Sequence, residues 1–255
     1  MSSAPTKRRI GILGGMGPEA TVLLMSRIIG MTVAHDDADH VPMLVDNNTQ
    51  VPSRIKALID KTGEDPGPVL IDMALRLEAA GVTALAMPCN TAHYYAPRIQ
   101  AAVSVPLLDM IELSADAAAK AAASQDPGDR LIGILASPAV QATGLFDRAC
   151  AGRGLETAYP ADQDSLLACI RAVKANGDTA QARDLLKRAA SELHRQGVKV
   201  MLIACSELSI ISEAIPEDFG AIDTLDVLAD AVVKFACAGT LAEAAAADAA
   251  QAPQS

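Results

Sequence analysis

Two cysteines stand where a thiol could take part in chemistry. Cys89 in MPCNTAHYY and Cys205 in LIACSELSII each end an apolar run. Each is followed by residues that commonly begin helices, Asn90-Thr91 and Ser206-Glu207. A helix N-terminus offers free N–H groups and a positive dipole end, which lower a thiol pKa and favour the thiolate. We therefore expect Cys89 and Cys205 to be catalytic.

The remaining cysteines fit a structural role. Cys150, Cys169 and Cys237 lie in helix-like stretches, where cysteine is usually a small buried hydrophobe. Five widely spaced cysteines, an odd number, do not suggest a disulfide framework. We expect the protein to occupy a reducing cytoplasm.

His93 opens two other interpretations of Cys89. It lies four residues after Cys89 and could join both cysteines in a metal site. The chain has no CxxC motif and no second histidine nearby to complete a tetrahedral site, so we expect no metal. A Cys-His hydrolase dyad stays open, although a spacing of four residues from a helix start is poor evidence for it.

The chain repeats itself at low similarity. RRIGILGG at 8–15 is echoed by RLIGILAS at 130–137, and residues 77–95 lie over 193–211 at a constant offset of 116. VPLLD, ending at Asp109, also resembles GAID, ending at Asp223. The common order of these echoes indicates two related halves, each contributing one thiol to a shared cleft.

Each half alternates short apolar runs with longer amphipathic stretches, which is typical of a parallel sheet covered on both faces. Helices are predicted at about 18–31, 66–80, 163–175 and 179–196, with Asn176-Gly177 ending the third. Strands are predicted at about 9–14, 41–46, 82–88, 105–109, 130–136, 155–159, 198–204 and 220–223.

The predicted fold is therefore α/β, with two similar parallel-sheet domains and an active site in the cleft between them. One domain is expected to comprise 1–112 plus a returning C-terminal helix within 224–255, and the other 113–223. SQDPGD at 124–129 is the candidate linker. Ligands of open parallel sheets bind outside the carboxyl ends of the strands, where both cysteines fall.

A glycine-rich stretch follows the first predicted strand. Gly15, Gly17 and Ala20 fit the G-x-G-x-x-A pattern of dinucleotide-binding turns. Asp46 ends the next strand about thirty residues downstream, rather than the ~20 of that fingerprint. We interpret the stretch as an anion-accepting loop at the floor of the cleft.

Composition excludes several classes of partner. The net charge of −10 and pI near 4.8 disfavour nucleic acid and anionic membrane surfaces. No apolar run approaches the roughly 18 residues of a membrane span. A small anionic substrate would need a local cluster of Arg, Lys and backbone N–H groups.

Five motifs together resemble the aspartate/glutamate racemase superfamily, and within it the aspartate racemases. They are ILGGMGPEAT, DNNTQVPSR, MPCNTAH, AVKANG and ACSELS, within a resemblance that spans about residues 8 to 235. It implies two α/β domains related by pseudo-twofold symmetry, a homodimer, and neither pyridoxal phosphate nor metal. It also implies a cysteine on either face of the substrate Cα.

The resemblance assigns roles position by position. Cys89 and Cys205 match the catalytic thiols, and Arg54 and Lys174 match the residues that recognise the side-chain carboxylate. Glu207 stands where glutamate racemases carry a histidine, which favours the aspartate branch. The residues expected to contact substrate are Met16, Gly17, Gln50, Arg54, Asn90, Thr91, Lys174, Ser206 and Glu207, with Asn90 and Thr91 holding the α-carboxylate.

The expected activity is cofactor-independent interconversion of L- and D-aspartate by proton transfer at Cα, with one cysteine as thiolate and the other as thiol. Within the superfamily, a broader acidic amino-acid racemase, a hydantoin racemase, or a diacid isomerase or decarboxylase stays open. From other classes, an NAD-dependent dehydrogenase and a non-catalytic small-ligand binding protein stay open.

Overall fold

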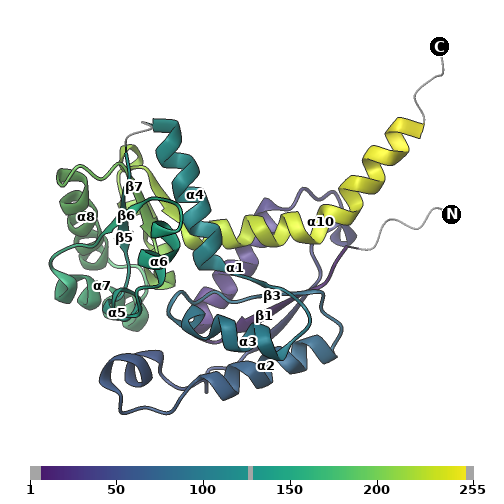
Figure 1. Ribbon diagram of the computed structural model, residues 1–255, viewed down its shortest axis with the longest axis horizontal. Helices are drawn as coiled ribbons and strands as arrows, with labels where there is room; N and C mark the ends of the chain where they lie inside the picture. The colour runs from purple at the N-terminus through teal and green to yellow at the C-terminus, as the bar shows by residue number, and fades with distance from the viewer. Residues whose placement is uncertain (1–6, 126–128, 251–255) are drawn as a thin grey trace.

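The computed structural model describes residues 7–125 and 129–250 and forms two parallel sheets of four strands each. The first has the order β2-β1-β3-β4, and the second has the order β6-β5-β7-β8. Figure 1 shows two α/β units, with α4 and α10 where they meet. The α/β fold with two similar parallel-sheet halves is confirmed.

The first half holds β1 to β4 and α1 to α4. Its strands are β1 (Ile10–Gly14), β2 (Met43–Asn47), β3 (Ala84–Ala86) and β4 (Leu107–Leu108). Its α-helices are α1 (Pro18–Met31), α2 (Gly67–Ala79), α3 (Ala96–Ala102) and α4 (Met110–Gln125). Three short helical segments complete it: η1 (Asp37–Asp39), η2 (Lys56–Asp60) and η3 (Thr91–Tyr95).

The second half repeats this strand arrangement. Its strands are β5 (Leu131–Leu135), β6 (Glu156–Ala158), β7 (Val200–Ile203) and β8 (Ala221–Asp223). Its helical segments are α5 (Pro138–Thr143), α6 (Leu145–Ala151), α7 (Gln163–Asn176), α8 (Ala180–Arg195), α9 (Ser206–Ile210), η4 (Ser212–Ala214), η5 (Glu217–Phe219) and α10 (Thr224–Ala250).

The predicted elements are found where the sequence patterns placed them. All eight strands lie inside their predicted ranges to within two residues, and the four helices match to within one. The apolar central strands β1, β3 and β7 are buried along their whole length. The predicted helix end at Gly177 also forms, since Gly177 caps α7, and Thr179 accepts the Ala182 N–H at the start of α8.

The internal repeat extends to the packing around one glycine in each half. A Cβ at Gly11 of β1 would lie 2.9 Å from Leu85 and 3.1 Å from Val82. A Cβ at Gly133 of β5 would lie 2.9 Å from Val198 and 3.1 Å from Met201. Val82 and Val198, like Leu85 and Met201, are equivalent positions of the repeat. The same close approach therefore recurs in both halves.

Two long helices join the halves. Met110 at the start of α4 packs in the core of the first half, whereas Ala115 and Ala118 of α4 pack in the second. Leu228 and Val232 of α10 return to the first core. The boundary at 112/113 lies within α4, and the domain limits stay a prediction. Residues 1–6 and 251–255 of the predicted first domain, and 126–128 of the predicted linker, lie outside the described residues.

In the described part of the chain, no helix combines the length and hydropathy that a membrane crossing requires.

We expect Gly133→Ala to lower the free energy of unfolding by about 1–2 kcal/mol, because the added methyl overpacks a buried contact. Gly30→Ala is the matched control, since a Cβ there meets nothing within 4 Å and lies on the exposed side of α1. Alanine at Gly30 should be neutral or stabilising by up to about 1 kcal/mol. Urea unfolding monitored by circular dichroism measures both, and equal effects would contradict the packing account.

Candidate active site

The strand order places the two thiols at equivalent points of the two sheets. In each sheet the chain reverses its direction of winding between two neighbouring strands, β1 and β3 or β5 and β7. The carboxyl ends of such a pair form the usual ligand crevice of a parallel sheet. Cys89 follows β3 and Cys205 follows β7. Both cysteines therefore lie at the predicted position.

Residues from both halves line one cavity of about 310 Å³. Nine of the predicted site residues line it, Met16, Arg54, Cys89, Asn90, Thr91, Lys174, Cys205, Ser206 and Glu207. The cavity thus combines both thiols with cationic, hydroxyl and carboxylate side chains. The two cysteine motifs, which correspond to each other in the repeat, therefore line a single cavity.

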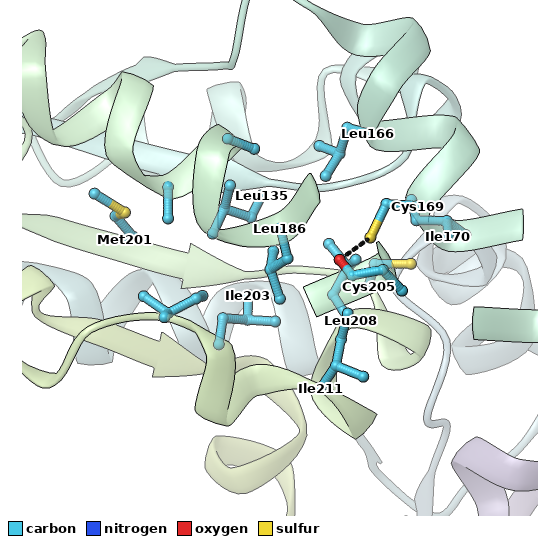
Figure 2. Close-up of a cluster of buried hydrophobic side chains, with 14 of the residues drawn as sticks. Leu135, Leu166, Cys169, Ile170, Leu186, Met201, Ile203, Cys205, Leu208 and Ile211 are labelled. Atoms are coloured by element: carbon cyan, nitrogen blue, oxygen red, sulfur yellow. Dashed lines mark hydrogen bonds between the residues drawn. The ribbon is translucent and has the colours of Figure 1, made fainter. Parts of the chain in front are cut away.

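Cys205 is held as a thiol in this cavity. Its side chain lies at the edge of the apolar cluster of the second half, near Leu208 and Ile170 (Figure 2). Its Sγ donates a hydrogen bond to the Glu207 carboxylate at 3.1 Å. Burial and the negative charge of Glu207 raise the pKa of Cys205 well above its usual range.

The sequence-based expectation of a lowered thiol pKa is therefore wrong for Cys205 in this state. Cys205 does cap α9, and the N–H groups of Glu207 and Leu208 favour its thiolate. These N–H groups are outweighed by burial and by the carboxylate two residues away. A helix of five residues also has only a small dipole to offer.

Cys89 lies in a turn whose backbone is closely held. Its side chain is 7 % exposed and packs at the edge of the first core. Its N–H donates to Met87 O at 2.8 Å, and its carbonyl accepts from the Ala92 N–H at 3.2 Å. The predicted helix start is found as the 3-10 segment η3, which runs directly into α3.

His93 serves the backbone of this turn. Its Nδ1 donates to Cys89 O at 2.9 Å, and its Nε2 accepts from the Met110 N–H at 3.1 Å. Burial lowers the pKa of the His93 imidazole, so the ring is neutral. Because both ring nitrogens are hydrogen-bonded to backbone groups, neither is free to bind a metal or to take a proton from Cys89.

The backbone after Cys89 offers an anion site. Among the described residues, the N–H groups of Asn90 and Thr91 have no hydrogen-bond acceptor. The Asn90 side chain is engaged elsewhere, donating to Thr224 Oγ1 at 3.2 Å. That hydroxyl in turn donates to Ile203 O at 2.9 Å, which links the Cys89 turn to β7.

Three cationic side chains face the two thiols. Arg54 comes from the first half, and Arg171 and Lys174 come from α7 of the second. No ion pair engages any of them within residues 7–125 and 129–250. Arg54 instead donates to Met16 O at 3.3 Å and Pro52 O at 3.1 Å, which fixes it against the glycine-rich loop.

Two predicted substrate contacts do not line the cavity. Gly17 lies beside it, in a smaller hollow of about 160 Å³ that shares Lys174, Ser206 and Glu207 with it. Gln50 is exposed, and its side chain donates to the neighbouring Thr49.

Several residues that line the cavity were not predicted from the sequence. Ser137 could have been found, because it stands in RLIGILAS where RRIGILGG has Gly15. Arg171 lies three residues before Lys174, a spacing that puts both on one helix face. Ser53 and Ala204 lie inside the quoted motifs DNNTQVPSR and ACSELS, whereas Ile55, Leu167 and Ile170 lie outside any motif.

Gly15 of the first loop has a packing reason of its own. It has a φ of 93°, and a Cβ there would lie 2.3 Å from the backbone of Asn48. Asp46, the candidate ribose ligand of a dinucleotide site, forms an ion pair with Arg76 at 2.7 Å. Neither Gly15 nor Asp46 therefore needs a nucleotide to explain it.

Two other cysteines are buried and inert. Burial raises the pKa of Cys150 and of Cys169 to about 11. Cys169 donates to Ala182 O at 3.2 Å within the apolar cluster, as the dashed line in Figure 2 marks. Both are structural residues, as predicted.

Comparisons with known proteins agree with this geometry. Residues 13–232 match the Asp/Glu/hydantoin racemase family. The aspartate racemase of Picrophilus torridus is 31% identical in sequence and superimposes with a TM-score of 0.77, over 90% of this chain and 94% of that one.

Two further proteins are similar. The broad specificity amino-acid racemase RacX of Bacillus subtilis (strain 168) is 27% identical over 229 residues, which are 88% of this chain and 96% of that protein. An aspartate racemase homologue from Pyrococcus horikoshii OT3 shares the fold at 20% identity, with a TM-score of 0.70 over 90% of this chain and 99% of that one. With the family matched over most of its length and the same two-sheet architecture, the chain belongs to the Asp/Glu/hydantoin racemase family.

Proposed function

We propose that this racemase interconverts L- and D-aspartate without a cofactor, using Cys89 and Cys205 to move the Cα proton. The observation that carries the proposal is the meeting of two thiols and three cationic side chains in one cavity of about 310 Å³. A dicarboxylate needs such fixed positive charge. Similarity to the aspartate racemase of Picrophilus torridus supports the same substrate.

The two thiols divide proton removal from proton return. Because Cys205 holds its proton in the unliganded protein, Cys89 is the base that takes the first Cα proton. Cys205 then gives its proton to the opposite face of the carbanion. Cys89 is left as the thiol and Cys205 as the thiolate, which is the form that reacts with the other enantiomer.

The carbanion needs electrostatic stabilisation in a cavity that excludes water. The free N–H groups of Asn90 and Thr91 are suited to the α-carboxylate. Arg54 from one half and Lys174 from the other are suited to the side-chain carboxylate. Because both Lys174 and Arg171 are exposed on α7, closure of the two halves on the substrate would complete the site.

A broader acidic amino-acid racemase is the second candidate. The similarity to RacX supports it, and so does Arg171, a third cation that could receive a longer side chain. A diacid isomerase would use the same thiols. A homodimer and a cytoplasmic location stay predictions that follow from the resemblance and from cysteine usage.

The deciding experiment uses the purified protein with L-aspartate in heavy water and no added cofactor. We expect optical rotation to decay to zero while one deuterium appears at Cα by NMR. Glutamate and alanine, tested alongside, separate the aspartate proposal from the broader one. Deuterium exchange without loss of rotation, or no reaction with any amino acid, would reject racemisation.

We expect Cys89→Ala and Cys205→Ala each to reduce racemisation by several orders of magnitude while leaving the fold intact. Each thiol serves one face of Cα, so neither replaces the other. Cys169→Ala, a change to a buried thiol outside the cavity, is the control and should retain activity. Near-normal turnover by either folded cavity variant would defeat the two-thiol mechanism.

Arg54→Leu and Lys174→Leu should each lower kcat/KM for aspartate by about one to two orders of magnitude, since a lost charged hydrogen-bond partner typically costs ~1.5–3 kcal/mol. Activity on alanine, which has no side-chain carboxylate, should fall much less. Lys187→Leu on α8, away from the cavity, controls for net charge. Parallel loss of both activities would remove these residues from the side-chain pocket.

Glu207→Gln should lower the pKa of Cys205, because it removes the carboxylate charge that opposes the thiolate. The pH dependence of Cys205 alkylation by iodoacetamide, read by mass spectrometry, measures the change. We expect its midpoint to move to lower pH in the variant, with Cys89 in the same sample as reference. An unchanged or higher midpoint for Cys205 would show that Glu207 does not hold it as a thiol.

A further inference from the structure

Each thiol is followed, four residues later, by a buried polar side chain that does not line the cavity. His93 follows Cys89 and is 2 % exposed, and Ser209 follows Cys205 and is 3 % exposed. The two positions correspond in the repeat, at the same offset of 116 that relates the cysteines. The two positions carry different residue types, His and Ser, and each makes hydrogen bonds near its cysteine.

In the first half, the imidazole of His93 bridges two backbone groups. Its Nδ1–H donates to Cys89 O, and its Nε2 accepts from the N–H of Met110. Met110 is the first residue of α4, the helix that follows β4. The ring therefore ties the carbonyl of the thiol-bearing residue to the start of the next long helix.

In the second half, a hydroxyl and a carboxylate make the same connection. The Oγ of Ser209 lies within hydrogen-bond distance of both Cys205 O, at 3.4 Å, and Asp223 Oδ1, at 2.8 Å, and the Ser209 N–H also donates to Cys205 O at 3.1 Å. That carboxylate oxygen also accepts from the N–H of Leu225 at 2.9 Å. Leu225 lies at the start of α10, the helix that follows β8, as α4 follows β4.

The second connection has a brace from the other half. Arg27 of α1 lies 3.0 Å from Asp223 Oδ2, and it donates to Ser209 O at 3.3 Å. Ser209 is thus held through its hydroxyl by Asp223 and through its carbonyl by Arg27. Because α1 packs on the first sheet, this brace fixes the Cys205 turn relative to the half that carries Cys89.

We propose that His93 and the Ser209–Asp223 pair are equivalent positioning residues, one for each thiol. The inference rests on the proposed two-thiol function. Cys205 is followed by the five-residue α9, and Cys89 by η3, which runs directly into α3. The side chains of His93 and Ser209 tie these helix starts to the beginnings of α4 and α10, which fixes where each sulfur points. A misplacement of about 1 Å at a reacting group can cost roughly 100-fold in rate.

Ser209→Ala tests the second anchor, with Ser212→Ala as the matched control. Ser212 is half-buried and its Oγ donates to Ser209 O, but it makes no bond to Asp223. We expect Ser209→Ala to lower kcat for aspartate about tenfold or more with KM within about twofold, because proton transfer suffers rather than binding. Ser212→Ala should stay within about twofold of wild type. Equal effects of the two changes would overturn the proposal.

Isotope effects separate positioning from a general loss of structure. With deuterium at Cα, Ser209→Ala should enlarge the primary isotope effect on kcat/KM for the enantiomer that Cys205 deprotonates and shrink it for the other. His93→Gln, which keeps an acceptor for Met110 but loses the donor to Cys89 O, should produce the opposite pair of shifts. If the isotope effect for a given enantiomer moved in the same direction in both variants, the proposal that each thiol has its own anchor would be rejected.

Thiol reactivity tests the anchors without relying on racemisation. Ser209→Ala should raise the alkylation rate of Cys205 by iodoacetamide severalfold and leave that of Cys89 within about twofold, and His93→Gln should do the reverse. If no amino acid is racemised by wild type but this selective pattern holds, the proposed function fails and the anchors stand. If both thiols respond alike to each variant, or neither responds, the anchors fail whatever the activity.

Discussion

The carboxyl ends of β3 and β7 open onto one cavity, and contacts between the two halves hold these strand ends next to each other. The hydrogen bonds from Asn90 to Thr224 and from Thr224 to Ile203 join the Cys89 turn to β7. The ion pair between Arg27 and Asp223 joins α1 to the end of β8. Arg27 and Asp223 are largely buried, so removing either one would leave the other charge buried and unpaired, which typically costs about 3–5 kcal/mol.

The electrostatics of the cavity are opposite to those of the whole protein. The chain carries a net charge of −10, yet Arg54, Arg171 and Lys174 face the cavity against the single carboxylate of Glu207. Salt screens the distant acidic residues beyond about 8 Å, whereas the local cations act at contact distance. A substrate with two carboxylates is therefore compatible with an acidic protein.

The fold and the two thiols were predictable because they depend on local signals. Strands and helices follow apolar periodicity, and the echo between Cys89 and Cys205 gave their equivalence. The chemical state of Cys205 was not predictable, since it results from burial by Ile170 and Leu208, which only packing reveals. Gln50 was predicted to contact substrate because it lies in a motif that follows β2, but its side chain is exposed to solvent.

The two halves differ at one position close to the thiols that bears on the proposed chemistry. The position two residues after the thiol is Thr91 in the first half and Glu207 in the second, so only Cys205 has a carboxylate beside its sulfur. Two-base proton transfer needs one thiol and one thiolate, and the carboxylate beside Cys205 favours the proton on that sulfur in the unliganded protein. In the proposed mechanism the repeat supplies one thiol for each face of Cα, which suits a reaction whose product is the mirror image of its substrate. The difference at this position then sets which of the two thiols holds the proton before substrate binds.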